Sequence, residues 1–464
     1  MSTDTTERIH ETWLHSERTL PTRFVRPALR FLHIEAAGGG LLVVAAVAAL
    51  VWANGPFGSS YFDFWGTHLT IDLGGFHLDE SLQHLVNDAL MAVFFFVVGL
   101  EIKRELVAGR LRDLRQAAVP AIAAIGGMVV PALIYTVVAA PGGSEAVAGW
   151  GIPMATDIAF SMGVLALLGR RVSLGAKLFL LTLAIADDIG AIAVIAIVYT
   201  SGVSLLWLLG GCVGLALIHV AGRVGIRSLT FYGMMAVAVW YAFLESGVHA
   251  TLAGVAVAFL TPASAWYSNE QYRTKATTVL ASYADDAQRR HADERIDASA
   301  LDLASVARES VAPLDRMERA LHPWTSFAVV PLFALANAGV RFTGVDIGTL
   351  VTHPVTLAVT LGLVAGKSVG IVAATWLAVR SGIGVLPPGT GWRQVFGLAT
   401  LAGIGFTVSM FISELAFADR ELVDAAKLGI FAGSLIAAIV GCRLLMAGND
   451  GSSDVLIGDH RTEP

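Results

Sequence analysis

Long apolar segments alternate with short polar turns along most of this chain. The segments are about 18–25 residues long, close to the roughly 20 residues that a helix needs to cross a bilayer. In lipid every backbone polar group has to be paired, and a helix achieves this within its own segment. The pattern therefore predicts an all-α polytopic membrane protein. We expect twelve transmembrane spans, at residues 33–54, 84–102, 117–139, 146–168, 174–199, 204–222, 228–244, 248–262, 324–340, 355–379, 396–416 and 424–446.

Polar segments divide the chain around two groups of spans, 33–262 and 324–446. We expect 1–32 to be a tail and 447–464 a disordered tail. The insertion 263–323 is polar, and its part 263–318 indicates a solvated helix or a disordered loop. At about 67–78, alternating residues around a Gly-Gly turn predict a small β-hairpin outside the membrane. Its exposed edge could pair with a second subunit, or the hairpin could cap its own helices.

The positive charges predict the orientation. If both termini lie inside, all but four of the 31 Lys and Arg residues fall on the inner side or in inner turns. Arg341, Arg420 and Lys427 then lie outside, and Lys367 lies within a span. Because positively charged loops stay in the cytoplasm, this bias predicts that both termini are cytoplasmic.

Composition agrees with a membrane protein. Hydrophobic residues make up 55% of the chain and charged residues 15%, and the mean hydropathy is +0.68. Cys212 and Cys442 are the only cysteines, and both lie in apolar segments. The sequence therefore has no disulfide framework and no cysteine-rich metal site.

Four ionisable residues, Asp157, Asp187, Asp188 and Lys367, lie near the centres of predicted spans. An ionised side chain there costs several kcal/mol or more. Asp187 and Asp188 are adjacent, so on a helix they point about 100° apart. We expect one to face Lys367 and the other a water-filled cavity. A structural salt bridge is the alternative role of Lys367, but it leaves the second aspartate unpaired. Two such carboxylates indicate a site that a cation or protons neutralise.

Two predicted spans carry interruptions in their middle. The fourth contains Gly, Pro and Asp in Gly151–Asp157, and the eleventh contains two Gly and a Thr in Leu401–Thr407. Spans 3–5 and 10–12 are corresponding three-helix units of opposite orientation. The pattern predicts inverted repeats whose interrupted helices cross at the midplane around an ion site, as in several families of secondary transporters. Asp157 could then neutralise helix N-termini and Lys367 helix C-termini.

Two other classes of protein are weaker alternatives. An intramembrane aspartyl protease would combine Asp157 with Asp187 or Asp188. Lys367 argues against it, because a nearby cation keeps a carboxylate charged. A cation channel is disfavoured by the paired interrupted helices and by the lack of a ring-forming repeat in the sequence.

Eight motifs are recognisable along the chain, and the adjacent aspartates lie in one of them, LAIADDIG. The motifs are Asn87–Phe95, Val98–Glu105, Met154–Phe160, Leu183–Gly190, Ser246–Gly254, Leu321–Trp324, Pro331–Gly339 and Gly403–Ser409. Together they resemble the motifs of the bacterial NhaA sodium/proton antiporters, and the resemblance runs from about residue 30 to 446.

The resemblance implies electrogenic exchange of one Na⁺ or Li⁺ for two protons across the bacterial inner membrane. It assigns Asp188 and Asp187 as ion and proton carriers, with Lys367 as the partner of Asp187 and with Asp157 and Thr156 at the helix crossing. A transporter of this kind is not an enzyme, and we expect no cofactor and no nucleic-acid partner. We expect a homodimer through the hairpin. A related monovalent cation/proton antiporter with a shifted ion preference is the alternative.

The resemblance also implies a pH-sensing cluster at the inner funnel. The matching positions are Glu101, Arg104, Glu105, Glu318 and His322. The sequence departs from the family pattern twice here. Arg319 replaces a His directly after Glu318, and Asp315 replaces a basic residue three positions before it. Both changes, and the insertion 263–318 that leads into the cluster, leave the pH set-point open.

Overall fold

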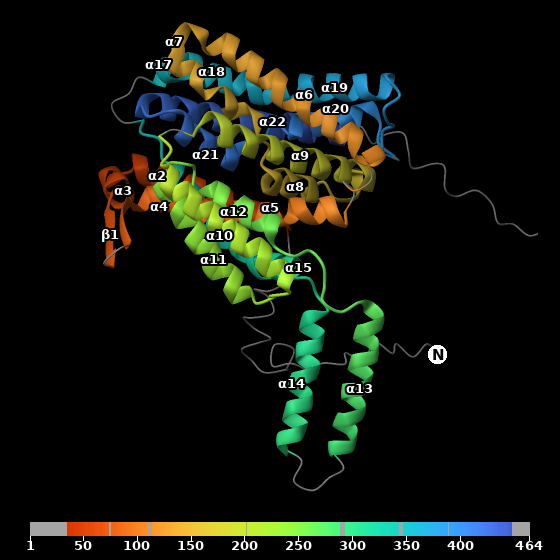
Figure 1. Cartoon of the computed structure of the whole chain (residues 1–464). Coiled ribbons are helices and arrows are strands. Elements are labelled where there is room, and N and C mark those ends of the chain that lie inside the picture. The colour runs from red at the N-terminus through yellow and green to blue at the C-terminus, as the bar shows by residue number, and fades with distance from the viewer. Residues whose placement is uncertain are drawn as a thin grey trace, which may run out of the picture.

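Helices form the body of the molecule (Figure 1). The computed structural model describes residues 35–73, 76–109, 112, 114–200, 202–287, 293–342, 347–387 and 389–447. The first part of the chain contains α2 (Glu35–Asn54), α3 (Gly58–Trp65), β1 (His68–Leu73), β2 (Phe76–Ser81), α4 (Leu82–Leu85), the π turn η3 (Val86–Leu90) and α5 (Met91–Val107).

The middle of the chain contains both long helices and short pieces. Its elements are α6 (Leu114–Ala139), η5 (Ala140–Gly142), α7 (Gly143–Val147), η6 (Ala148–Met154), α8 (Ile158–Leu167), η7 (Gly169–Arg171), α9 (Leu174–Val198), α10 (Leu205–Val224), α11 (Leu229–Ser246), α12 (Thr251–Leu260), α13 (Asn269–Ala287) and α14 (Asp293–Glu309). The last part contains α15 (Pro313–Trp324), the π turn η8 (Thr325–Val329), α16 (Val330–Asn337), α17 (Ile347–Thr352), α18 (Pro354–Leu361), the π turn η9 (Gly362–Gly366), α19 (Lys367–Arg380), α20 (Trp392–Leu401), α21 (Phe406–Ala416) and α22 (Arg420–Ala447).

Several helices can cross a membrane. Among the described residues, eight helices are long and apolar enough, and nine if the bent pair α20–α21 counts as one span. The other three predicted spans coincide with interrupted or short helices. The fourth is split between η6 and α8, the eighth contains the ten-residue α12, and the ninth contains η8 and the eight-residue α16. Ten helical residues rise only about 15 Å, half of a bilayer core. Membrane-spanning helices are therefore present, while the count of twelve and the repeat relation stay predictions.

The predicted hairpin is present and is longer than expected. Strands β1 and β2 pair antiparallel, from His68 opposite Ser81 to Leu73 opposite Phe76. The Gly74-Gly75 turn lies outside the described residues. At the base of the hairpin, the Leu82 amide donates to the Thr67 carbonyl at 2.9 Å. The hairpin thus begins and ends at one point and projects from one end of the helical body (Figure 1).

The polar insertion is helical where the structure describes it. Helices α13 and α14 form an antiparallel pair that extends away from the body (Figure 1). Most of their side chains are exposed. The base is closed by the Trp266 amide, which donates to the Glu309 carbonyl at 2.9 Å. We call the end of the body from which this pair projects the insertion end. The predicted tail 1–32 and all but the first residue of the predicted tail 447–464 lie outside the described residues, and Ala447 ends α22.

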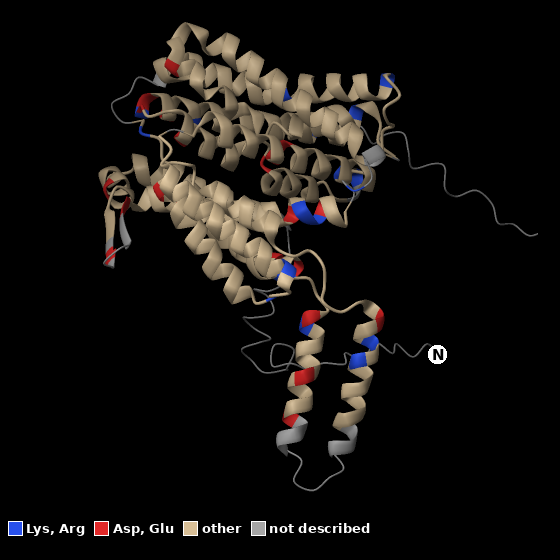
Figure 2. Ribbon diagram, viewed as in Figure 1, with Lys and Arg blue, Asp and Glu red and all other residues tan. Residues whose placement is uncertain are grey.

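Glycines allow the helices around the candidate site to approach closely. A Cβ atom on Gly126 of α6 would lie 2.4 Å from the Gly370 carbonyl oxygen of α19, and one on Gly370 would lie 2.2 Å from that of Gly126. These two backbones therefore touch. Figure 2 shows that the helical body has few charged residues along its length, whereas α13 and α14 contain charged residues of both signs.

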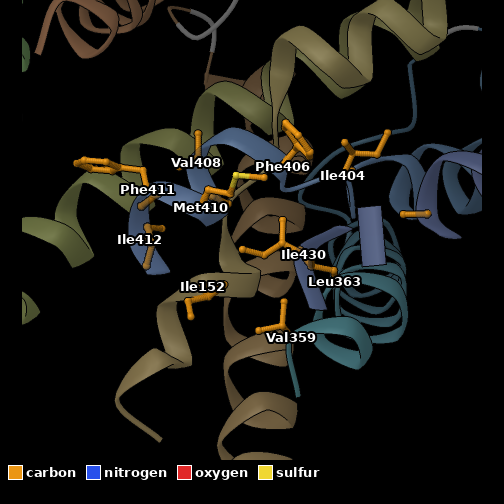
Figure 3. Close-up of a cluster of buried hydrophobic side chains, with 14 of the residues drawn as sticks. Ile152, Val359, Leu363, Ile404, Phe406, Val408, Met410, Phe411, Ile412 and Ile430 are labelled. Atoms are coloured by element: carbon orange, nitrogen blue, oxygen red, sulfur yellow. The ribbon is translucent and has the colours of Figure 1, made fainter. Parts of the chain in front are cut away.

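A buried apolar cluster surrounds the interrupted helices (Figure 3). It joins η6 and α21 to the π turn η9 and to α22 through Ile152, Leu363, Phe406, Phe411 and Ile430, all buried. Protein interiors of this kind are close-packed, so they hold polar groups between them in fixed positions. The cluster therefore fixes where the two interrupted segments meet.

Candidate functional site

The two interrupted segments meet backbone to backbone. The chain is not helical between η6 and α8 or between α20 and α21, and the Asp157 amide donates to the Ile404 carbonyl at 2.7 Å. Asp157 then caps both helices that begin here. Its Oδ1 accepts from the Phe160 amide at 2.9 Å, and its Oδ2 accepts from the Thr407 amide at 3.1 Å and the Thr407 hydroxyl at 2.7 Å. A carboxylate offsets the partial positive charge of two helix N-termini in this position.

Lys367 and Asp187 form an ion pair between α19 and α9, and both side chains are fully buried. Thr156, in the first interruption, joins them. Its hydroxyl accepts from Lys367 Nζ at 3.0 Å and lies 2.7 Å from Asp187 Oδ2 and 2.8 Å from the Ala402 carbonyl oxygen. A hydroxyl has one proton, so Thr156 can donate to only one of these two oxygens at a time. The three side chains form one compact polar cluster.

Asp188 lies on the other side of α9 and faces a cavity of about 130 Å³. Asp157, Thr156 and Thr407 line the same cavity, and Asp187 does not. The two adjacent aspartates therefore have different surroundings, as the 100° step along a helix requires. Oxygen ligands are the ones that hard cations prefer. The deep end of the cavity offers a carboxylate and hydroxyl oxygens to such a cation.

The cavity extends from Asp188 to Glu101 of α5 and His322 of α15. The His322 side chain is 55% exposed, so this end reaches the surface. Its Nε2 lies 3.9 Å from Glu101 Oε1. The cavity therefore connects the Asp188 carboxylate with the insertion end of the body.

The remaining candidate pH-sensing residues lie beside this opening. Arg104 forms an ion pair with the buried Glu318, and Glu105 is one turn beyond Glu101 in α5. Glu318 lies in α15, ahead of the membrane-spanning part. Burial raises the pKa of its carboxyl, Arg104 opposes this rise and Asp315 adds to it. Arg319 is exposed and also acts to lower this pKa. The structure thus brings all five predicted residues to one end of the cavity.

Lys427 is a buried charge that the reading of the sequence did not single out. It lies in α22, where its side chain is 2% exposed. Its Nζ lies 2.6 Å from Glu414 Oε1 near the end of α21. The signal in the sequence was a lysine inside an apolar run with a carboxylate thirteen residues earlier, and only the turn between α21 and α22 brings the two together.

The described residues contain no group of three His, Cys, Asp or Glu side chains that could hold a metal ion. Asp187 is turned toward Lys367, so it does not join Asp157 and Asp188 in one ligand set. A cation in the cavity would therefore meet the open carboxylate of Asp188, the hydroxyl oxygens of Thr156 and Thr407, and the Asp157 carboxylate, whose oxygens already accept three hydrogen bonds.

Comparisons with known proteins agree with this site. The family described as Na⁺/H⁺ antiporter 1 matches residues 29–445. The chain is 44% identical to Na(+)/H(+) antiporter NhaA 2 of Myxococcus xanthus, over 89% of this chain and 88% of that protein. It is also 44% identical to Na(+)/H(+) antiporter NhaA of Koribacter versatilis, over 93% of each chain. The same identity holds for Na(+)/H(+) antiporter NhaA of Rhodopirellula baltica, over 93% of this chain and 98% of that protein.

These relatives are transporters rather than enzymes, which leaves the protease alternative without support. The matches cover both interrupted segments, the adjacent aspartates and Lys367. The chain belongs to the NhaA family of Na⁺/H⁺ antiporters.

Proposed function

We propose that this protein exports Na⁺, or Li⁺, across the bacterial inner membrane in electrogenic exchange for about two protons. The observation that carries the proposal is the difference in surroundings between the two adjacent aspartates. Asp188 faces the cavity, whereas Asp187 is paired with Lys367. One carboxylate is therefore open to an entering cation while the other has a cation of its own.

Competition for Asp188 couples the two ions. A carboxyl group that holds a proton cannot at the same time hold Na⁺. At low pH the proton occupies Asp188, and at high pH the carboxylate is open to Na⁺. Thr156, Thr407 and Asp157 supply further oxygens at the same end of the cavity. The capping bonds of Asp157 hold the two interrupted segments together around the cation.

The Asp187–Lys367 pair is the second proton carrier in this proposal. When Na⁺ binds at Asp188, its charge disfavours the Lys367 ammonium nearby, and the pair releases a proton. Two protons against one Na⁺ move one net charge in each cycle. A charge that crosses the membrane gains about 2.3 kcal/mol per 100 mV, so the membrane potential drives export.

The opening of the cavity is the site proposed to sense pH. Glu101 and His322 line it, and the Arg104–Glu318 pair and Glu105 lie beside it. Protonation of these groups would change the charge that an approaching cation meets. The insertion helices α13 and α14 lead directly into α15, which carries Glu318 and His322, so the set-point is specific to this chain.

We further propose that the insertion end and both termini are cytoplasmic. The excess of Lys and Arg in the turns of that side supports this orientation. The β-hairpin then lies on the opposite side of the membrane. The edge of β1 or β2 is available there for a second subunit, which makes a homodimer the proposed assembly.

The experiment that tests the proposal is Na⁺-induced collapse of a pre-formed pH gradient in proteoliposomes. Na⁺ and Li⁺ should dissipate the gradient, K⁺ should not, and Asp188→Asn should abolish the response. Asp302→Asn, on the exposed face of α14, is the control and should leave it unchanged. A K⁺ response as strong as the Na⁺ response would favour the alternative of a shifted ion preference. Coupled exchange retained in Asp188→Asn would rule out the assignment of the carrier.

A further inference from the structure

The helix that carries Lys367 contains one residue more than a regular helix needs. The Lys367 amide donates to the Gly362 carbonyl, five residues back, instead of the carbonyl four residues back. This bond closes the π turn Gly362–Gly366 immediately before the lysine. Turns of this kind are single-residue insertions in α-helices and often occur at functional sites.

The half of the helix before this turn is fixed against α22. The Thr356 hydroxyl lies 2.9 Å from the Ala425 carbonyl oxygen and 2.8 Å from that of Leu350, and the Thr360 hydroxyl lies 3.2 Å from the Gly429 carbonyl oxygen. Leu363 is next along this stripe, and a Cβ atom on Gly433 would lie 3.0 Å from its side chain. The spacing of four and then three residues is that of one helix face.

On a regular helix, Lys367 would be the next residue of the same stripe. It is eleven residues after Thr356, which is about 1100°, only about 20° beyond three full turns. The lysine would then point at α22. The extra residue turns it back by about 100°. In the structure it reaches Asp187 of α9 and Thr156 instead.

From the end of the turn onward, the helix packs against α6. A Cβ atom on Gly366 would lie 2.7 Å from the Pro131 Cα atom, and one on Gly370 would lie 2.2 Å from the Gly126 carbonyl oxygen. At the start of the turn, a Cβ atom on Gly362 would instead meet the Pro153 side chain of η6 at 2.7 Å. The helix therefore has different neighbours before and after the turn.

We propose that the π turn Gly362–Gly366 is a positioning segment, whose extra residue places Lys367 on Asp187 rather than on α22. Because of the extra residue, the first half of this helix packs against α22 and the second half packs against α6. The lysine then lies at the crossing, beside Asp187. The role of the Lys367–Asp187 pair in proton transfer rests on the proposed function. The claim that the π turn places Lys367 on Asp187 does not depend on transport.

Two single-residue deletions test the proposal. Ala365 and Val369 are both exposed and lie on either side of Lys367. Either deletion leaves a regular helix between the α22 contact and the Gly370–Gly126 contact. Without Ala365 the lysine is ten residues after Thr356 and keeps its present direction. Without Val369 it stays eleven residues after Thr356 and turns toward α22.

The readout is the melting temperature of each purified variant with and without Lys367→Ala, which does not depend on transport. We expect Lys367→Ala to lower it as much in the Ala365 deletion as in the full chain, and to have little effect in the Val369 deletion. Na⁺/H⁺ exchange should survive only the first deletion. Equal effects of Lys367→Ala in the two deletions would overturn the positioning role. Absence of exchange in the full chain would instead refute the proposed function and leave this comparison intact.

A third variant covers the case in which a deletion prevents folding. Removing Ala365 and inserting an alanine after Val369 preserves the length of the helix and moves the extra residue beyond the lysine. We expect this variant to keep the stabilising effect of Lys367. A folded protein in which Lys367→Ala no longer lowers the melting temperature would contradict the proposal.

Discussion

Asp187 and Asp188 share a peptide bond but occupy opposite chemical situations. Asp187 has a lysine, a hydroxyl and no contact with the cavity, whereas Asp188 lines the cavity and is 4% exposed. A buried ion pair contributes little net stability, but removing one partner leaves an uncompensated charge. Removing the partner of Asp187 should therefore lower the stability of the protein, whereas Asp188 has no such partner to lose among the described residues.

Replacing Lys367 with Ala should destabilise the protein by about 3–5 kcal/mol, because Asp187 is left buried without its partner. The double variant Asp187→Asn with Lys367→Ala should recover part of this loss. Thermal unfolding in detergent measures both, with Lys275→Ala on the exposed α13 as the control. An effect of Lys367→Ala no larger than that of the control would contradict the buried pair.

Glu318 predicts a pH dependence of stability. Burial raises the pKa of its carboxyl above the ordinary value of 4.5, so the folded state holds this proton more tightly than the unfolded state. The resulting stabilisation is present below pH 4.5 and is lost as the pH rises through the folded-state pKa. The melting temperature should therefore fall less with rising pH in Glu318→Gln than in the wild type. Glu270→Gln, on the exposed side of α13, should behave as the wild type, and parallel curves for all three proteins would refute the assignment.

Single candidate residues could be predicted from the sequence better than the elements or their arrangement. Charges in apolar runs are few, so Asp157, Asp187, Asp188 and Lys367 stand out without any structure. Lys427 did not, because it lies near a predicted span end, where a lysine normally reaches water. Its burial depends on the path of α21 into α22, which the sequence pattern does not define.

At the scale of the elements, an ion pair with Lys427 of α22 attaches α21, the second half of the second interrupted helix. Glu414, near the end of α21, pairs with the buried Lys427 of α22 at 2.6 Å. The pair holds α21, whose first turn contains Thr407 beside Asp157, against the long last helix. Rigid attachment of α21 therefore helps to keep the crossing in place.

Glu414→Gln should destabilise the protein by about 3–5 kcal/mol, since Lys427 would keep its charge in a buried position. Adding Lys427→Met should restore much of the stability, because it removes the unpaired charge and keeps the volume. Unfolding by heat tests this, with the exposed Glu421→Gln as the matched control. If the double variant is less stable than Glu414→Gln alone, the pair is not the cause.

Interrupted helices were predictable where Gly, Pro and polar residues interrupt an apolar run. The π turns were not. Hydrophobic periodicity in a membrane helix is weak, because lipid-facing and buried positions are both apolar. One extra residue before Lys367 becomes visible only when α22 and α6 are known as its two neighbours.

In the whole molecule, two paired segments project from the helical body, the β-hairpin at one end and α13–α14 at the other (Figure 1). Backbone hydrogen bonds close the base of each segment, so each can be removed without cutting a helix of the body. The sequence predicted the hairpin from its alternation but left the insertion open between helix and loop, since two mostly exposed helices with mixed charge have no strong periodic pattern.

Replacing residues 68–81 with two glycines should convert a dimer into a monomer, because the strand edges proposed to join the subunits are gone. Light scattering of the detergent-solubilised protein measures the mass. Replacing Asn269–Glu309 with the same linker is the control, and it should leave the dimer intact. A dimer that survives loss of the hairpin would show that the subunits meet elsewhere.

The central claim is that Na⁺ and protons compete for Asp188 in one cavity, and the pH dependence of transport kinetics tests it most directly. In proteoliposomes between pH 6.5 and 9, the KM for Na⁺ should rise as the pH falls, while the rate at saturating Na⁺ stays nearly constant, because enough Na⁺ displaces the proton. A constant KM with a maximal rate that falls on acidification would mean that protons act at a separate site, and would contradict the account.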